Sequence, residues 1–313
     1  MLKNTLKALL PNSAINALRR WKVSLVRLRE GHLSSADFWS QHHVDAPSDG
    51  FTDPDASLRH LHWRNQQYPG HSELMPVSDA DDLVVVDYGC GPGNDIVGLG
   101  TASRPKQLIA FDISPIALQL AARRAQLHSI EARFGQLSES SAILPLDANS
   151  VDLIHSAGVL HHTVDPVAIL REFRRVLKPD GCARVMVYNR NSVWMHLHVA
   201  YEMRIANGLY ADISKEDAFA RTTDGESCPI ARCYRPDEFL ALAEQAGFKA
   251  EFVGSAVSLF ELKRLPMIYD ALKDQRLDRE SADFLAALRF NDRLWPIHDG
   301  QVAGINGYFL LRP

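Results

Sequence analysis

The sequence predicts an α/β fold in which helices cover a mostly parallel β-sheet. Two observations predict it. Between residues 83 and 190, short apolar runs alternate with amphipathic segments of helical length, which is typical of repeated β-α-β units. The alternation stops after residue 189 and returns at residues 235–254. A chain of 313 residues has room for one large domain, or for a domain with a lid.

Within the alternating region, each element has a local signal. Two helices have standard starts, because Ser114 and Asp165 are capping residues that each precede a proline. These helices are expected at 114–128 and 165–177, and the segment KPDG that follows the second predicts a turn. Five strands are expected around them, at residues 83–88, 107–112, 131–135, 150–158 and 182–189.

After Asn189 the pattern changes. Residues 190–234 read first as helix and then as a polar loop, which predicts a lid over the substrate. Trp194, Leu197 and Tyr201 have the i, i+3, i+7 spacing of one α-helical face, for which core packing is the alternative use. The elements expected beyond the lid are a helix at 235–248, a strand at 249–254, helical segments near 259–273 and 280–290, and a last strand at 303–311.

Residues 1–82 are expected to form a helical N-terminal extension to the domain of residues 83–313. The first 30 residues are basic and amphipathic. A solvated helix packed on the core is the default reading of such a segment, and weak contact with an anionic membrane surface is the alternative.

Composition excludes several classes of protein. Hydrophobic residues make up 46% and charged residues 23%, as in ordinary globular domains, and a net charge of -4 argues against a nucleic-acid binder. No apolar run is long enough to cross a membrane, and no signal-peptide pattern opens the chain. Four scattered cysteines indicate reduced thiols in a cytoplasmic protein. Cys228 and Cys233 have no standard zinc-ligand spacing, so no metal is expected.

The segment VVVDYGCGPGND (84–95) ends an apolar strand in three closely spaced glycines. A dinucleotide fingerprint would need glycine at position 94, where this chain has Asn94. The observed spacing is expected to offer backbone amides to a small polar ligand, with Asp87 accepting from a cationic group. A structural turn is the alternative. Asp112 ends the next strand, where a carboxylate can hold both hydroxyls of a ribose.

Four segments carry a family resemblance: VVVDYGCGPGND, LIAFDIS, LPLDANSVDLIHSAGVLHHTVDP and FRRVLKPDGCARVMVYN. With them the chain resembles the class I S-adenosylmethionine-dependent methyltransferases, and within these the small-molecule branch that includes quinone-biosynthesis enzymes. The resemblance implies a Rossmann-like seven-stranded sheet with an antiparallel last strand, and S-adenosylmethionine as the cofactor. The implied cofactor contacts are Asp87, Gly89, Gly91, Gly93, Asp112, Ile113 and Ser156. After the third strand the family usually has an acid near the adenine, which this sequence lacks, and Gln136 and the backbone of Leu137 are expected to take its place.

Candidates for the chemistry and for the acceptor are less specific. His161 is predicted as a general base that takes the proton of the acceptor, with structural packing as the alternative for it and for His162. The residues expected to contact substrate lie before the first strand and in the lid, and packing or solvation is the alternative for each: Trp63, Arg64, Tyr68, Tyr201 and Asp224.

The sequence therefore predicts a methyltransferase of a small-molecule acceptor, by in-line transfer to oxygen, nitrogen or carbon. A macromolecular acceptor and a catalytically silent cofactor-binding module are the alternatives. The oligomeric state does not follow from the sequence.

Overall fold

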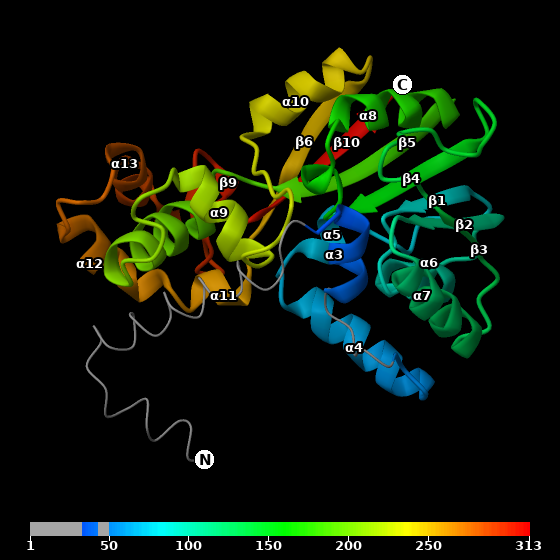
Figure 1. Cartoon of the computed structure of the whole chain (residues 1–313), viewed down its shortest axis with the longest axis horizontal. Coiled ribbons are helices and arrows are strands. Elements are labelled where there is room, and N and C mark those ends of the chain that lie inside the picture. Colours follow the sequence, from blue (N-terminus) through cyan, green and yellow to red (C-terminus); the bar gives the residue numbers. More distant parts are fainter. Residues whose placement is uncertain (1–32, 43–49) are drawn as a thin grey trace.

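The computed structural model describes residues 33–42 and 50–313. At its centre is a seven-stranded sheet of order β3-β2-β1-β4-β5-β10-β6, in which β10 runs antiparallel to both of its neighbours (Figure 1). The predicted α/β fold and its antiparallel last strand are confirmed. The strands are β1 (Val84–Tyr88), β2 (Gln107–Asp112), β3 (Arg133–Gln136), β4 (Val151–Ala157), β5 (Leu177–Tyr188), β6 (Lys249–Ala256) and β10 (Asn306–Arg312).

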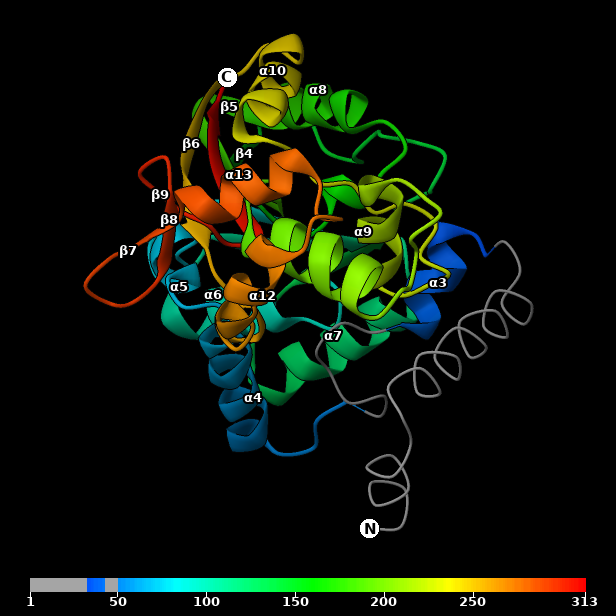
Figure 2. The same cartoon turned by 90° about the vertical axis from the view of Figure 1, so that its left-hand side faces the viewer.

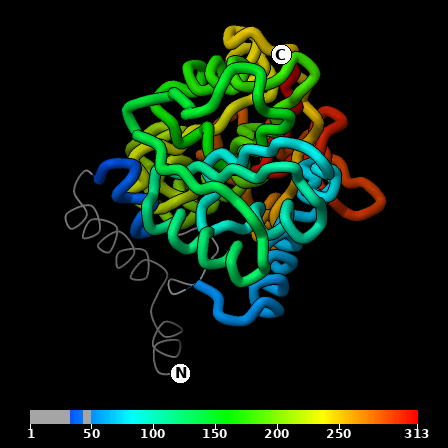
Figure 3. Tube along the Cα trace, turned by 90° about the vertical axis from the view of Figure 1, so that its right-hand side faces the viewer, coloured from blue at the N-terminus to red at the C-terminus, as the bar shows by residue number. Residues whose placement is uncertain are grey.

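Helices cover both faces of the sheet (Figures 1 and 3). The strands are therefore apolar on both sides: Val86 of β1 packs in the cluster of α8 and α10, whereas its neighbour Val85 packs in the cluster of α6 and α7. The four helices are α6 (Asn94–Ala102), α7 (Pro115–Leu127), α8 (Pro166–Val176) and α10 (Pro236–Gln245).

The predicted helix starts are confirmed, and the predicted turn after α8 is wrong. The Ser114 hydroxyl accepts from the backbone N–H of Ala117, and the Asp165 carboxylate caps α8 in the same way. Residues 178–181 belong to β5, which begins at Leu177. The register there shifts, because β5 advances five residues while β4 advances two, so the extra residues are absorbed as a bulge.

The segment after β5 forms a 13-residue π-helix, η2 (Trp194–Ala206), followed by α9 (Lys215–Thr223). The predicted α-helical face is therefore wrong, since a π-helix has a wider turn. Leu197 and Tyr201 pack together against α12 and α13, whereas Trp194 packs in a different cluster with Tyr68. Figure 1 shows α9, α12 and α13 together at one end of the sheet.

The chain between β6 and β10 completes this helical layer. The first predicted helix divides into three short pieces, and a small sheet of order β7-β8-β9, which was not predicted, protrudes beside it (Figures 2 and 3). The elements are α11 (Leu259–Leu262), η3 (Leu265–Met267), α12 (Ile268–Lys273), α13 (Arg279–Ala287), β7 (Arg289–Phe290), β8 (Pro296–His298) and β9 (Gln301–Val302).

Within the described ranges, three helices precede the sheet: α3 (Ser35–Gln41), α4 (Pro54–Gln66) and α5 (His71–Leu74). The basic segment of residues 1–30 lies outside the described residues. Arg124 of α7 is 2% exposed and holds α4 in place, because its guanidinium donates to the hydroxyl and the carbonyl of Ser57. No helix in the described ranges is both long and apolar enough to cross a membrane.

Candidate active site

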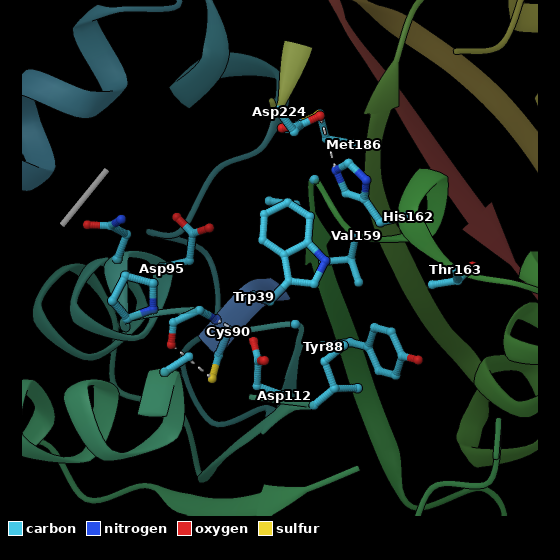
Figure 4. A pocket seen from close by; sticks show the side chains of 18 of the residues that line it. Trp39, Tyr88, Cys90, Asp95, Asp112, Val159, His162, Thr163, Met186 and Asp224 are labelled. Carbon is cyan, nitrogen blue, oxygen red and sulfur yellow. Dashed lines mark hydrogen bonds and ion pairs between the residues drawn. The ribbon is translucent and has the colours of Figure 1, made fainter. Parts of the chain in front are cut away.

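A cavity of about 250 Å³ opens at the edge of the sheet where β1, β2, β4 and β5 end. Side chains from the helices before β1 cover it. In Figure 4, Trp39 of α3 lies across the opening, between Asp112 on one side and His162 and Asp224 on the other. We call the side near Asp112 the glycine-loop end, and the side formed by Trp39, Tyr68, His162, Tyr188 and Asp224 the aromatic end.

The glycine loop is built for a left-handed backbone, with φ of +76°, +51° and +85° at Gly89, Gly91 and Gly93. A Cβ at Gly89 would collide with Val159, whereas a Cβ at Gly91 would meet no atom within 4 Å. Gly91 therefore presents bare backbone to the cavity, and a ligand can approach it closely.

The loop amides are used inside the protein, which corrects the expectation that they serve a ligand. The N–H groups of Gly89 and Cys90 donate to the Phe111 carbonyl, and that of Gly93 donates to the Cys90 carbonyl. The remaining one, on Gly91, donates to the Asp112 carboxylate at 2.8 Å. The loop therefore shapes the wall of the cavity, while its amide groups are already hydrogen-bonded within the protein.

Asp112 ends β2 and joins the loop to the next helix. Its Oδ2 accepts from Gly91 N, and its Oδ1 accepts from Ser114 N, both at 2.8 Å. The side chain lines the cavity beside Ile113 and Leu137. Two charge-assisted hydrogen bonds fix a carboxylate at the glycine-loop end.

Four of the expected cofactor residues do not line the cavity: Asp87, Gly93, Gln136 and Ser156. Asp87 and Ser156 are 2% and 0% exposed and lie in the sheet beneath the cavity. Burial, with the nearby Asp95 charge, raises the pKa of Asp87 well above its usual range. Gln136 is on the surface, where its amide donates to the Ile113 carbonyl. The side chains of Asp87, Gln136 and Ser156 therefore do not reach the cavity in this structure.

A polar network lies beside the glycine loop. Arg64 of α4 donates to Asp95 of α6 at 2.6 Å and to His71 Nε2 at 2.9 Å. Because Nε2 accepts, the other ring nitrogen of His71 carries the proton and donates to the hydroxyl of Tyr308 at 2.8 Å. Burial lowers the pKa of His71 to about 3, so the ring is neutral. The network ties the N-terminal helices to the last strand.

At the aromatic end, His162 and Asp224 face one another. His162 Nδ1 lies 2.6 Å from the Ile230 carbonyl, and a carbonyl only accepts, so Nδ1 donates and Nε2 keeps its lone pair. Asp224 Oδ1 accepts from the Tyr188 hydroxyl at 2.8 Å. Its Oδ2 lies 3.7 Å from His162 Nε2 and has no hydrogen-bond partner among the described residues.

Burial governs the charges of this pair. It lowers the pKa of His162, against the opposing effect of Asp224, and raises the pKa of Asp224, against the opposing effect of His162. The Trp39 and His162 ring centroids are 4.7 Å apart. Cys228 completes a group of possible metal-ligand atoms, which all lie within 4.8 Å of one another together with those of His162 and Asp224.

His161, the predicted base, does not reach the cavity. It is fully buried behind His162, its ring centroid lies 3.8 Å from that of Tyr188 with the rings tilted by 30°, and its Nδ1 accepts from Tyr188 N. Burial lowers its pKa well below the usual range. The packing alternative fits this position, and His162 is the member of the pair that faces the cavity.

Of the five residues expected to contact substrate, three line the cavity and two do not. Arg64, Tyr68 and Asp224 line the cavity. Trp63 is 49% exposed on the outside of α4, and Tyr201 packs in the core against α12 and α13, so neither reaches it. Lining residues that sequence reasoning missed include Trp39, His42, Asp95, Tyr188 and Asn306.

Comparisons with known proteins agree with this architecture. Residues 79–247, more than half of the chain, match the family model described as a methyltransferase domain. A ubiquinone biosynthesis O-methyltransferase of Leptothrix cholodnii is 27% identical over 44% of this chain and 58% of that protein, so less than two thirds of its length is matched. A ubiquinone/menaquinone biosynthesis C-methyltransferase of Syntrophotalea carbinolica is 26% identical over 56% of this chain and 74% of that protein.

The fold also matches a solved structure. An S-adenosylmethionine-dependent methyltransferase from Mesorhizobium loti superposes with a TM-score of 0.50 at 16% identity, over 85% of this chain and 100% of that chain. At that identity the match supports the shared fold.

Proposed function

Because this chain belongs to the class I S-adenosylmethionine-dependent methyltransferase family, we propose that it transfers the methyl group of S-adenosylmethionine to a small-molecule acceptor. The quinone-biosynthesis relatives named above support an acceptor of this size. The observation that carries the proposal is the pairing of Asp112 with the backbone of Gly91, which keeps a carboxylate and a bare glycine side by side in one cavity.

The cavity suits the cofactor in shape and in charge. The space that a Cβ of Gly91 would fill is open, so the cofactor can lie against the backbone there. We assign the ribose hydroxyls to Asp112 and the adenine to the apolar side chains of Ile113 and Leu137. When bound, S-adenosylmethionine supplies a methyl group that its sulfonium has already made electrophilic.

The protein then has to orient the acceptor and keep water away. Positioning of this kind can supply roughly 7–11 kcal/mol of the barrier. Trp39 and Tyr68 cover the aromatic end of the cavity, which would limit access of water. We assign the role of proton acceptor to His162 instead of His161, since its Nε2 keeps a lone pair on the cavity side.

Asp112→Asn tests the proposal. It preserves the shape of the side chain but loses the charge that two backbone amides and the ribose would share. Loss of charge-assisted hydrogen bonds worth about 1.5–3 kcal/mol should weaken binding of S-adenosylmethionine about 10- to 150-fold by isothermal titration calorimetry.

Asp152→Asn is the matched control. Asp152 also accepts from a backbone amide, that of Val84 at 2.8 Å, but it lies outside the cavity. Its variant should bind the cofactor as wild type does. Equal affinity in wild type and Asp112→Asn, or an equal loss in both variants, would contradict the proposed cofactor site.

A further inference from the structure

At the aromatic end, His162 Nε2 and Asp224 Oδ2 face each other, and each can accept a hydrogen bond when the imidazole is neutral. His162 Nε2 and Asp224 Oδ2 are 3.7 Å apart, too far for a hydrogen bond with each other. Asp224 Oδ2 has no partner among the described residues, although its side chain is only 10% exposed. Leaving such a group unpaired is costly, so the arrangement calls for a ligand that donates.

We propose that the acceptor is an amine, which enters as its ammonium form and donates to both atoms at once. This inference rests on the proposed function and names the class of its substrate. A nitrogen about 2.8–3.0 Å from each atom spans a gap of 3.7 Å. A hydroxyl has one proton to donate, so it would leave one of the two acceptors unpaired.

The charge of the cavity favours a cation. Among the described lining residues, three carboxylates stand against one guanidinium, with the histidines counted as neutral. Asp95 pairs with Arg64, and Asp112 accepts two backbone amides. The net positive charge of S-adenosylmethionine offsets one of the two excess negative charges. The charge that remains corresponds to Asp224, which an ammonium ion would neutralise.

The walls favour the same ligand. Trp39, Tyr68 and Tyr188 put three aromatic rings at this end of the cavity, and the Tyr188 and His162 ring centroids are 5.7 Å apart. Ring faces attract ammonium groups, by about 0.5–2 kcal/mol according to how far the site is dehydrated. The Tyr188 hydroxyl also holds Asp224 Oδ1, which leaves Oδ2 for the ligand.

The transfer can be written with its atoms in balance. A proton passes from the ammonium to His162 Nε2, while His162 Nδ1 keeps its proton on the Ile230 carbonyl. The neutral nitrogen forms the new bond to the methyl carbon as the sulfur–methyl bond breaks and its electron pair stays on sulfur. An N–H of the product remains on Asp224, and His162 later returns its proton to solvent.

The amine can reach Asp224 Oδ2 only if the segment that contains Asp224 moves. Oδ2 exposes less than 1 Å² in this structure. Asp224 follows α9 directly, within the proposed lid of residues 190–234. We therefore expect the amine to reach Oδ2 when this segment moves outward, and the lid to close over the bound amine.

The test measures binding, not turnover. The full chain is saturated with S-adenosylhomocysteine, and benzylamine and benzyl alcohol are titrated into it by calorimetry. These probes have the same ring and differ in the donor group. Benzylamine should bind at least about tenfold more tightly than the alcohol. Asp224→Asn should remove that difference, since it keeps an oxygen for Tyr188 but loses the charge.

Asp217→Asn is the control, because Asp217 is an exposed acid in α9, the helix that Asp224 follows, and lies outside this cavity. It should leave both titrations unchanged. Thermal unfolding checks that each variant is folded. S-Adenosylhomocysteine binding to each protein shows whether the cofactor site is intact, so a failure of the proposed function is seen separately.

Three outcomes would overturn the inference: equal binding of the two probes, amine binding that Asp224→Asn does not change, or no binding of either probe to the cofactor-loaded protein. The neighbouring thiol provides a further check. If Zn²⁺ binds and Cys228→Ser abolishes that binding, the orphaned oxygen is a metal ligand instead, and the inference fails as well.

Discussion

Gly91→Ala should separate the space around the glycine loop from the strain of its backbone. The added methyl group would meet no protein atom within 4 Å, so it would project into the cavity. At φ of +51° the alanine also takes on left-handed strain of about 1–2 kcal/mol. Overfilling a packed site costs about 1–3 kcal/mol, which corresponds to about 5- to 150-fold in cofactor affinity.

Gly300→Ala provides the comparison. Gly300 lies between β8 and β9 with φ of +77°, and a Cβ there also meets no atom within 4 Å. It is outside the cavity. The two variants should therefore lose a similar free energy of unfolding, about 1–2 kcal/mol by urea denaturation without ligand.

Calorimetry with S-adenosylmethionine then distinguishes them. Gly300→Ala should bind as wild type does, and Gly91→Ala should bind about 5- to 150-fold more weakly. If the two variants bind equally well, the cofactor does not lie against Gly91, and the reasoning from the open space at this glycine is refuted.

Three further predictions concern packing, pH and the lid. His161→Gln should lower the free energy of unfolding by about 1–3 kcal/mol, because it disturbs a buried hydrogen bond, with cofactor affinity unchanged by calorimetry; weaker cofactor binding in a protein of full stability would return His161 to the site. Burial raises the pKa of Glu261 to about 7 from 4.5, so its contribution to stability is complete below pH 4.5 and is lost as pH rises through 7, by about 3 kcal/mol. Glu261→Gln should remove that decline in urea denaturation between pH 5 and 8, and an identical decline in the variant would exclude Glu261 as its source. Lys215 joins α9 to Asp278 and Glu280, so Lys215→Met should speed hydrogen exchange in residues 215–223 but not in β1; equal rates in variant and wild type would show that these contacts do not restrain the lid.

Sequence predicted those features that depend on neighbouring residues. Ser114 caps a helix that begins with the next residue, so its role can be predicted from adjacent residues. The glycine loop and Asp112 follow and end two strands that are predicted by their apolar runs. The pairing of His162 with Asp224 joins positions 62 residues apart, and Trp39 reaches the cavity from a short helix, so neither has a local pattern.

Other differences have equally physical causes. The three apolar positions of η2 fit an α-helix over so short a stretch, and spacing alone does not separate it from a π-helix. Strands of two residues, such as β7 and β9, are too short to show alternation. The loop amides pair with carbonyls and a carboxylate, chiefly from the neighbouring strand, and this pairing is visible only in three dimensions.

The position of β10 determines the order in which the molecule can be completed. Among the described strands, β10 alone joins β6 to the sheet, and β10 also supplies Asn306 to the cavity. During synthesis, β6 therefore has no place in the sheet until residues 306–312 have left the ribosome. Until then the edge of β5 is an unpaired strand that can pair with another chain. Closing contacts so distant in sequence is slow, so the nascent protein is most prone to aggregate shortly before its cavity is complete.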